Sequence, residues 1–273
     1  MTLKFTILGC GSSGGVPRPA LGWGDCNPGN PKNRRRRTSL LAERRDNGGV
    51  TRSLVDTSPD LREQLLDAEV DWLDAVLYTH EHADHTHGID DLRALFIAQR
   101  RRIDVYLDEH TARSMHERFD YCFKSPPGSD YPPIVTEHRL APGNAITVAG
   151  KGGAITALPL LQQHGDIDSI GFRFGNFAYS CDLSGMPPDT VEALQGLDVW
   201  VIDALRYRPH PSHLSLDDAL GWIERITPRR AILTNLHADL DYEDLRAKLP
   251  AHVEPAFDGM TVTVAESTPV SVG

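Results

Sequence analysis

A dense group of histidines limits what this 273-residue chain can fold into. The group directly follows residues 75–78, an apolar segment typical of a β-strand. Its members are His80, His82, His85 and His87. With Asp84, the first three form a His-x-His-x-Asp-His pattern.

Alternate side chains of an extended segment point to one side, so His80 and His82 are expected to face the same point. Asp84 and His85 can then turn toward a second point as the chain enters a helix. Imidazole and carboxylate ligands at this spacing suit one or two ions such as Zn²⁺ or Mn²⁺.

The alternative is a solvated, histidine-rich turn that binds nothing. Residues of the same ligand types follow other strand-like segments: His164 comes after residues 154–158, Asp182 after residues 177–179 and His237 after residues 231–233. Active sites of α/β proteins form at the carboxyl ends of strands, so these side chains are expected to converge. Convergence favours the metal site over the solvated turn.

Short apolar runs typical of strands recur along the whole chain. They cover residues 4–8, 53–55, 75–78, 104–107, 154–158, 171–174, 177–179, 199–202, 231–233 and 260–264. Helical patterns lie between several of them, and there is no internal repeat or linker-like change of composition. The sequence therefore predicts an α/β fold with mixed sheets and outer helices, in a single domain over residues 1–273.

Three helices are indicated. Residues 59–68 begin with Ser58 as a cap and Pro59 in the first helical position, and residues 89–101 carry apolar side chains at turn spacing. Ser215 and Asp218 predict a capping box, after which the apolar side chains form a stripe at helical spacing. Residues 9–37 and 123–133 are expected to be loops, either functional rims or irregular connections.

Charge and cysteine content limit the partners and the compartment. The chain has 28 Lys and Arg against 38 Asp and Glu, a net charge of −10, which argues against attraction of the whole surface to nucleic acid or to anionic membranes. Nothing approaches the ~20 apolar residues of a membrane-spanning helix. The cysteines are widely spaced, which favours reduced thiols and a cytoplasmic location. They are Cys10, Cys26, Cys122 and Cys181.

The histidine pattern, followed by a distant His, an Asp and a last His, resembles the metallo-β-lactamase superfamily. The resemblance implies a four-layer αββα sandwich with two divalent metal ions, Zn²⁺ or Mn²⁺. One ion would be held by His80, His82 and His164, the other by Asp84, His85 and His237. Asp182 would bridge them, and Asp84 would also count among the catalytic residues. Asp56 matches an early Asp of the superfamily that braces the histidine-rich turn, although a simple turn residue is about as compatible with it.

Two cations that share a hydroxide lower its pKa toward ~7 and stabilise the negative charge of a hydrolytic transition state. Hydrolysis is therefore the expected reaction, and other residues must decide which bond is cut. His213 corresponds to an additional His of the phosphodiesterase and tRNA-processing branches, which acts on the phosphate or on the leaving oxygen. His210 is the less favoured neighbour, and either histidine can also be an ordinary surface residue.

The amino-terminal segment adds to the case for phosphodiesters. Gly9, Gly11 and Gly14 match G-x-G-x-x-G, but prolines follow where a dinucleotide-binding fold needs a helix, so this segment is interpreted as a loop. It resembles the opening of phosphoribosyl cyclic phosphodiesterases and tRNA-processing nucleases. Arg37, at the end of an arginine run over residues 34–37, and Ser13 are the predicted substrate-binding residues. Most of the run is expected to be solvated, and which of its arginines meets substrate stays open.

Two features favour a small or cyclic phosphodiester of phosphoribosyl or nucleotide type over folded RNA. Only 17 residues separate His164 from Asp182, where tRNA 3′-processing nucleases often carry a long arm. The acidic net charge points the same way. Cys26 stands alone where relatives can hold a structural zinc with several cysteines, so that extra site is expected to be absent. The alternatives are an acyl hydrolase acting on lactones or thioesters, a tRNase Z-like nuclease, and a metal-binding protein without turnover. A homodimer stays open.

Overall fold

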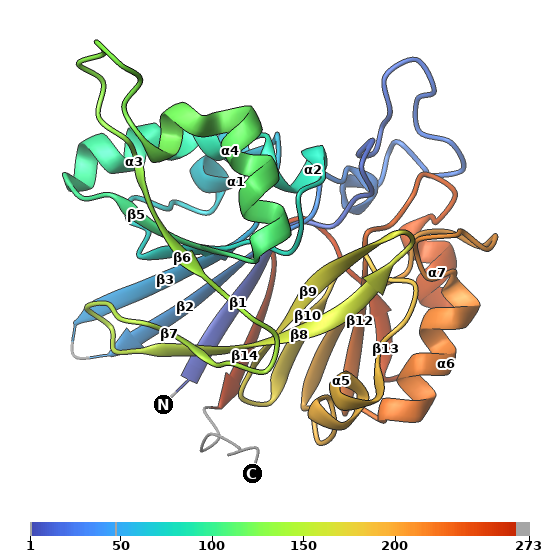
Figure 1. Cartoon of the computed structure of the whole chain (residues 1–273). Helices are drawn as coiled ribbons and strands as arrows, with labels where there is room; N and C mark the ends of the chain where they lie inside the picture. Colours follow the sequence, from blue (N-terminus) through green and yellow to red (C-terminus); the bar gives the residue numbers. More distant parts are fainter. Residues whose placement is uncertain (1, 47, 266–273) are drawn as a thin grey trace.

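The computed structural model describes residues 2–46 and 48–265, and its strands form two seven-stranded sheets (Figure 1). The first sheet has the order β14-β1-β2-β3-β4-β5-β6 and the second β13-β12-β11-β10-β9-β8-β7. In the first sheet the strands are β14 (Met260–Ala265), β1 (Thr2–Gly9), β2 (Ser39–Asp46), β3 (Gly49–Val55), β4 (Ala75–Leu77), β5 (Ile103–Leu107) and β6 (Val135–Arg139). In the second they are β13 (Val253–Pro255), β12 (Arg230–Thr234), β11 (Val199–Asp203), β10 (Phe177–Ser180), β9 (Ile167–Phe174), β8 (Ile155–His164) and β7 (Ile146–Val148).

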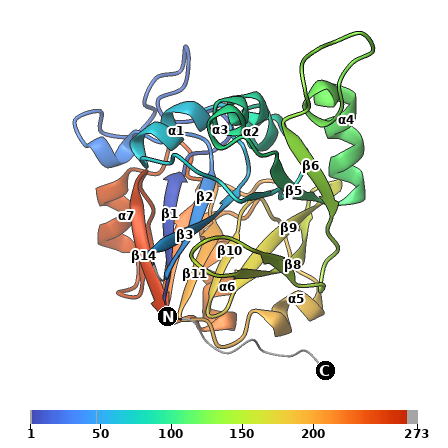
Figure 2. The same ribbon diagram turned by 90° about the vertical axis from the view of Figure 1, so that its left-hand side faces the viewer.

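Helices cover the outer face of each sheet, as the two views show (Figures 1 and 2). On the first sheet lie α1 (Leu61–Asp67), α2 (Ala83–Thr86), α3 (Leu92–Gln99) and α4 (Glu109–Phe123). On the second lie α5 (Pro188–Ala193), α6 (Leu216–Ile226) and α7 (Tyr242–Lys248). Short 3-10 helices are η1 (Pro31–Asn33) and η2 (Ile89–Asp91). The result is the predicted αββα sandwich in a single domain.

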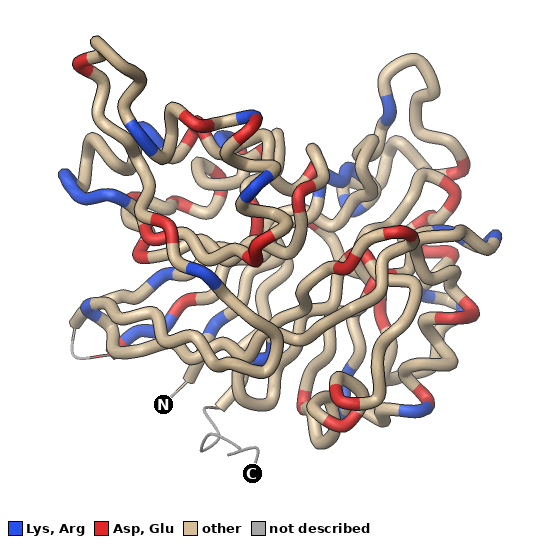
Figure 3. Tube along the Cα trace, in the orientation of Figure 1, with Lys and Arg blue, Asp and Glu red and all other residues tan. Residues whose placement is uncertain are grey.

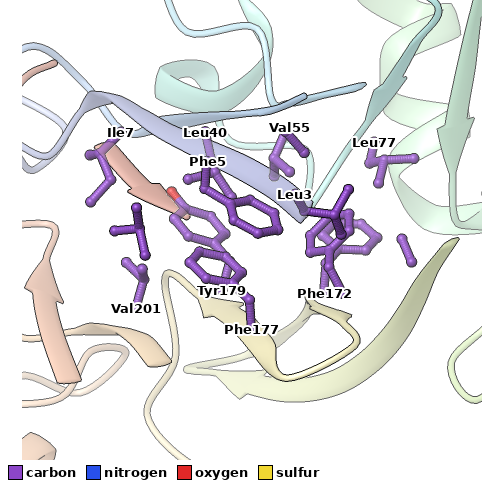
Figure 4. Packing of buried hydrophobic residues seen from close by; sticks show 14 of the residues in the cluster. Leu3, Phe5, Ile7, Leu40, Val55, Leu77, Phe172, Phe177, Tyr179 and Val201 are labelled. Carbon is purple, nitrogen blue, oxygen red and sulfur yellow. The ribbon is translucent and has the colours of Figure 1, made fainter. Parts of the chain in front are cut away.

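The two sheets are joined by a shared apolar core (Figure 4). Phe5 of β1 stacks on Phe177 of β10 with ring centroids 3.7 Å apart, and its centroid lies 5.4 Å from that of Phe174. All three side chains are buried, and such aromatic pairs add to the stability that area burial gives. Separate apolar clusters lie between each sheet and its own helices. The relative position of the two sheets is therefore fixed by packing.

Parallel strand pairing brings the carboxyl ends of several strands, and the candidate site residues that follow them, to one edge of each sheet. β3, β4, β5 and β6 run parallel to one another, and so do β10, β11, β12 and β13. The residues that follow β3 and β4 consequently meet those that follow β10, β11 and β12 at one end of the sandwich. Each strand-like segment predicted from the sequence lies in one of the observed strands, with differences of a few residues at the ends.

Four strands were not predicted. β2 ends in the charged residues Glu43, Arg44, Arg45 and Asp46, so its sequence does not read as a strand, yet backbone pairing with β1 and β3 on both sides defines it. β6 is similarly polar, and β7 and β13 have only three residues each. These segments are strands because their backbones pair with neighbouring strands. A local sequence pattern does not report such pairing.

The helix predictions were partly right. The capping box of Ser215 and Asp218 is confirmed at the start of α6. The predicted start at Pro59 is wrong, because α1 begins at Leu61. The Ser58 hydroxyl accepts from the Asp60 backbone N–H at 3.1 Å and donates to Gln64 at 2.9 Å, which forms a turn before the helix instead of capping it. The predicted helix over residues 89–101 is divided into η2 and α3. α4, α5 and α7 were not predicted.

The four cysteines are free thiols, as their spacing predicted, and the structure shows in addition that all four are buried. Of the helices in residues 2–46 and 48–265, none is both long and apolar enough to cross a membrane.

Candidate metal centre

Asp56, directly after β3, organises the histidine-rich turn that follows β4. It is fully buried, and its φ of 63° lies in the left-handed region, which a short polar side chain tolerates. The backbone N–H and the hydroxyl of Thr79 both donate to its carboxylate at 2.8 Å. His85 Nδ1 lies 2.7 Å from Asp56 Oδ2. With Nδ1 donating to Asp56, Nε2 is the ring nitrogen of His85 that remains to bind a metal.

His80 is oriented through the same network. The Thr79 hydroxyl gives its proton to Asp56, so it accepts from His80 Nδ1, which lies 2.9 Å away. The Nε2 atoms of His80 and His85 are both buried and have no hydrogen-bond partner among the described residues. A buried polar atom without a partner is costly. Two such imidazole nitrogens beside carboxylates fit a metal site.

The first ligand group combines His80 and His82 from this turn with His164, the last residue of β8, and Asp182, which follows β10. One ligand atom of each lies within 4.8 Å of one from every other. Asp182 Oδ2 is 3.8 Å from His80 Nε2 and 3.7 Å from His164 Nε2. His164 Nδ1 donates to the Ser212 carbonyl at 2.6 Å, so its Nε2 is the nitrogen that faces the cluster, 3.3 Å from His82 Nδ1. Burial and the neighbouring imidazoles lower the pKa of His80 well below its ordinary value, which keeps it neutral.

A second group of close ligand atoms consists of His85, Cys181 and the same Asp182, with Asp84 beside it. Asp182 Oδ2 lies 3.3 Å from His85 Nε2, and Asp84 Oδ2 lies 3.5 Å from the same nitrogen. Burial alone would lower the pKa of His85, but the charges of Asp182, Asp84 and Asp56 outweigh it and raise that pKa well above the ordinary value. Carboxylates that attract a proton this strongly attract any cation placed between them.

Asp182 presents one oxygen to both groups. All of its histidine contacts are made through Oδ2. Oδ1 instead accepts from the Cys181 thiol at 2.9 Å and from the Asn235 amide at 3.1 Å. Burial and the adjacent carboxylate charge raise the pKa of the Cys181 thiol, so it acts as a neutral donor. This arrangement suits a carboxylate shared by two ions.

His237 and Asn235 differ from the sequence-based picture. His237, like Asp84, belongs to neither group of mutually close ligand atoms. It lines the same cavity as Asp84 and Asp182, and its Nδ1 lies 3.1 Å from Asp239. Asn235 comes first after β12 and is the residue there that contacts Asp182. The sequence analysis did not identify Asn235, because it searched for histidine and carboxylate ligands and an amide is neither.

His213 lies beside the cluster and is held by Asp203, the last residue of β11. Its Nδ1 is 3.0 Å from Asp203 Oδ2, while its Nε2 is 3.9 Å from Asp182 Oδ2. Burial would lower the pKa of His213, but the hydrogen bond and charge of Asp203, with the charge of Asp182, raise it to about 9. Asp203 is fully buried. The sequence analysis did not predict its role, because the residues around Asp203 do not indicate a contact with a histidine ten positions later.

A cavity of about 260 Å³ opens onto these groups. Ser13, His210 and His213 line it, as do Arg18 and Arg206, which the sequence did not suggest. Arg37 is not among the described residues that line it, and its Nε pairs with Asp60 Oδ2 at 3.0 Å.

The arginine run mostly serves the fold. Arg35 is buried and donates to the carbonyls of Leu240 at 2.7 Å and His237 at 3.2 Å. Arg36 pairs with Asp258 and Asp67, and Arg34 is exposed. The amino-terminal loop is thereby attached to the turn between β12 and α7.

An αββα sandwich with clustered His and carboxylate ligands at the ends of its strands defines a metal-dependent hydrolase with the metallo-β-lactamase fold. The chain belongs to the beta-lactamase superfamily: the family model described as "Beta-lactamase superfamily domain" matches residues 51–235.

Three relatives illustrate the similarity. A solved structure described as a new diphosphatase from the PhnP family is 34% identical, with a TM-score of 0.86, and the match covers 97% of this chain and 98% of that one. The short form of human tRNase Z shares the fold at 18% identity and a TM-score of 0.61, over 98% of this chain and 100% of that chain. An octanoyltransferase of Porphyromonas gingivalis is 35% identical over 97% of this chain. This chain spans 52% of that protein, about half its length.

Replacing Asp56 by Asn tests the bracing of the ligand turn. Asn has one acceptor oxygen in place of two, so it cannot accept all three bonds from the Thr79 N–H, the Thr79 hydroxyl and His85 Nδ1. We therefore expect metal affinity to fall ~10–100-fold, as for other residues that orient metal ligands. Affinity is measured by titrating chelator against protein loaded with Zn²⁺ or Mn²⁺. Asp104→Asn is the matched control, because Asp104 pairs with His138 at 2.9 Å on the surface. Unchanged affinity in a folded Asp56→Asn variant would contradict this role.

Proposed function

We propose that this protein hydrolyses a small or cyclic phosphodiester, of phosphoribosyl or nucleotide type, at a centre of two divalent ions, Zn²⁺ or Mn²⁺. The observation that carries the proposal is the position of His213, held by Asp203 beside the shared carboxylate and at the wall of a cavity that also contains arginines. Similarity to a PhnP-family diphosphatase over nearly the whole length of both chains supports it.

The ligand assignment follows the two groups. His80, His82 and His164 would hold one ion and Asp84 and His85 the other, with Asp182 between them. We assign His237 as the remaining ligand of the second ion, since it lines the same cavity. When bound, the ions would supply a water of lowered pKa and positive charge for the attacked phosphate.

The chain's own groups complete the chemistry. His213 Nε2 would carry the proton that the departing alkoxide needs, and Asp203 fixes the ring so that this nitrogen faces the site. Asp84, close to Asp182 and His85, would contribute to catalysis as well as to binding. Ser13 and Arg37 remain our predictions from the sequence for substrate binding; of the two, Ser13 lines the cavity.

A small substrate is favoured over RNA by the shape of the chain between His164 and Asp182. β8 ends at His164 and β9 begins at Ile167, so a two-residue turn joins them. Basic and acidic positions are mixed over both halves of the fold (Figure 3), and the net charge is −10. Both features disfavour a long polyanion.

The metal content tests the two-ion centre. We expect elemental analysis of metal-replete protein to give two ions per chain, because the ligand set exceeds what one ion takes from protein while keeping a water position. Asp182→Ala should lower both metal content and activity, whereas Asp189→Ala, at an exposed position on α5, should change neither. A content that stays at one, or full activity without Asp182, would refute the shared centre.

Substrate class is tested by comparing rates. We expect kcat/KM for a nucleoside 2′,3′-cyclic phosphate and for bis(p-nitrophenyl) phosphate to exceed that for a tRNA precursor or an acyl thioester. Activity on RNA that falls steeply with salt, without activity on small diesters, would identify a nuclease. Faster thioester cleavage would identify an acyl hydrolase.

His213→Ala tests the proton donor. Both ions should stay bound, while turnover falls by ~10²–10⁴ for a sugar alkoxide leaving group, the usual contribution of a positioned acid. The loss should be smaller for p-nitrophenolate, which leaves without a proton. His210→Ala, a neighbour in the same cavity, is the control and should keep activity within about threefold. Equal losses for both leaving groups would leave only electrostatic stabilisation, and loss of metal would make His213 a ligand.

A further inference from the structure

Asn235 contacts both the shared carboxylate and the residue to which we assign the proton. Its side-chain nitrogen, Nδ2, lies 3.1 Å from Asp182 Oδ1 and 3.2 Å from His213 Nδ1. The residue is only 1% exposed, and what remains accessible lines the catalytic cavity. One uncharged side chain therefore joins the metal centre to the neighbouring histidine.

The neighbours of this amide determine how it is hydrogen-bonded. Asp182 Oδ1 belongs to a carboxylate and can only accept, so the amide atom that faces it is the nitrogen. His213 Nδ1 lies 3.0 Å from Asp203 Oδ2 and donates its proton to that carboxylate. A nitrogen that donates elsewhere does not accept from the amide. Asn235 therefore donates to Asp182 and packs against the ring of His213.

Asn235 is the stronger of two donors that hold Asp182 Oδ1. The other donor is the Cys181 thiol at 2.9 Å, and a thiol is a weak donor. Because Oδ1 is occupied in this way, Oδ2 is the oxygen that meets the histidines. Oδ2 lies 3.3 Å from His85 Nε2 and 3.7 Å from His164 Nε2. The direction in which the shared carboxylate points consequently depends on the amide.

The backbone after β12 explains why an asparagine stands here. Asn235 has a φ of 61°, in the left-handed region that Asn, Asp and Gly adopt most readily. The residues on either side are tied to other segments. The Thr234 carbonyl accepts from the Ala204 N–H at 3.0 Å, and the Leu236 N–H donates to the Cys10 carbonyl at 2.8 Å. Of the three residue types that suit this backbone, only Asn has a side-chain N–H donor.

We propose that Asn235 is a positioning residue that fixes Asp182 and His213 relative to each other, and so couples retention of the two ions to proton transfer. The proposal rests on the proposed function, because it takes His213 as the proton donor. Asn235 acts on Asp182 through its hydrogen bond. It acts on His213 by occupying the space beside the ring, with His213 Nε2 3.9 Å from Asp182 Oδ2.

Asn235→Gly tests this, because glycine lacks the amide but adopts a φ of 61° without strain. We expect the affinity for Zn²⁺, measured by titration with a chelator, to fall ~10–100-fold, as after loss of other residues that orient metal ligands. At saturating Zn²⁺, kcat for a nucleoside 2′,3′-cyclic phosphate should fall ~10–100-fold, because its sugar alkoxide needs a well-placed proton. For bis(p-nitrophenyl) phosphate the loss should stay below about threefold. A merely structural role would lower both rates equally.

Two further variants separate the contacts of Asn235. Cys181→Ala removes the weaker donor to the same carboxylate oxygen. We expect it to lower Zn²⁺ affinity less than Asn235→Gly does and to leave the ratio of the two rates unchanged. Glu69→Gly is the matched control, since it places glycine at an exposed left-handed position, with a φ of 53°, and should alter neither affinity nor rates. Unchanged Zn²⁺ affinity in folded Asn235→Gly, or equal losses for both leaving groups, would overturn the proposal while leaving phosphodiester hydrolysis in place.

A crystal structure of the zinc-loaded wild-type protein tests the contact without any substitution. We expect Asp182 to bind both ions through Oδ2 and to keep Oδ1 within hydrogen-bond distance of Asn235 Nδ2. Ligation through both oxygens, or loss of the amide contact, would overturn the proposal even if Asn235→Gly does not fold.

Zn²⁺ affinity separates the two proposals if the wild-type protein cleaves neither diester. In that outcome the proposed function fails. Weaker Zn²⁺ binding by Asn235→Gly than by wild type and Glu69→Gly would still support the action of Asn235 on Asp182. Equal affinity of the three proteins would overturn it.

Discussion

Buried carboxylates at the ends of parallel strands are the constraint on which the rest of the site depends. Asp56, Asp182 and Asp203 are 0%, 3% and 0% exposed, and a buried carboxylate is tolerated only with partners that compensate for lost water. Each has a histidine partner: His85 contacts both Asp56 and Asp182, and His213 contacts Asp203. The hydrogen bonds that compensate these carboxylates for lost water also orient the histidine rings. The imidazoles are therefore placed as soon as the strand ends are folded.

The site belongs to both sheets, which makes the packing between them part of its chemistry. Asp56 and the histidine-rich turn come from the first sheet, whereas Asp182, Asp203 and Asn235 come from the second. The aromatic contact of Phe5 with Phe177 lies in the core that joins the sheets (Figure 4). Metal ligands must be held within fractions of an ångström, which rigid elements achieve better than loops. The ligand distances across Asp182 therefore depend on a core that contains no ligand.

The sequence predicted contacts between residues that are close along the chain and missed those between distant segments. The turn from His80 to His85 is local, so spacing after an apolar strand was enough to find it. Asp203 contacts His213 and Asn235 contacts Asp182, in each case from another segment of the chain, and residue spacing does not report such contacts. The arginine run shows the limit most clearly: a charge run normally indicates a solvated surface, yet Arg35 is buried because carbonyls of residues 237 and 240 meet it. Only the fold brings those carbonyls within reach.

The residues of the metal centre and the residues that complete the cavity therefore come from different parts of the fold. The carboxylates and imidazoles lie at strand ends, where sheet geometry fixes them, and the fold itself also occurs in a structure that is only 18% identical. The cavity is completed by segments outside the sheets: the amino-terminal loop bearing Ser13 and Arg18, and the segment bearing Arg206 and His213. Arg35 attaches the first of these to the turn after β12, which carries His237 of the cavity, so the loop is joined directly to the site. A loop held in this way can change substrate preference through a single side chain while the metal frame stays unaltered.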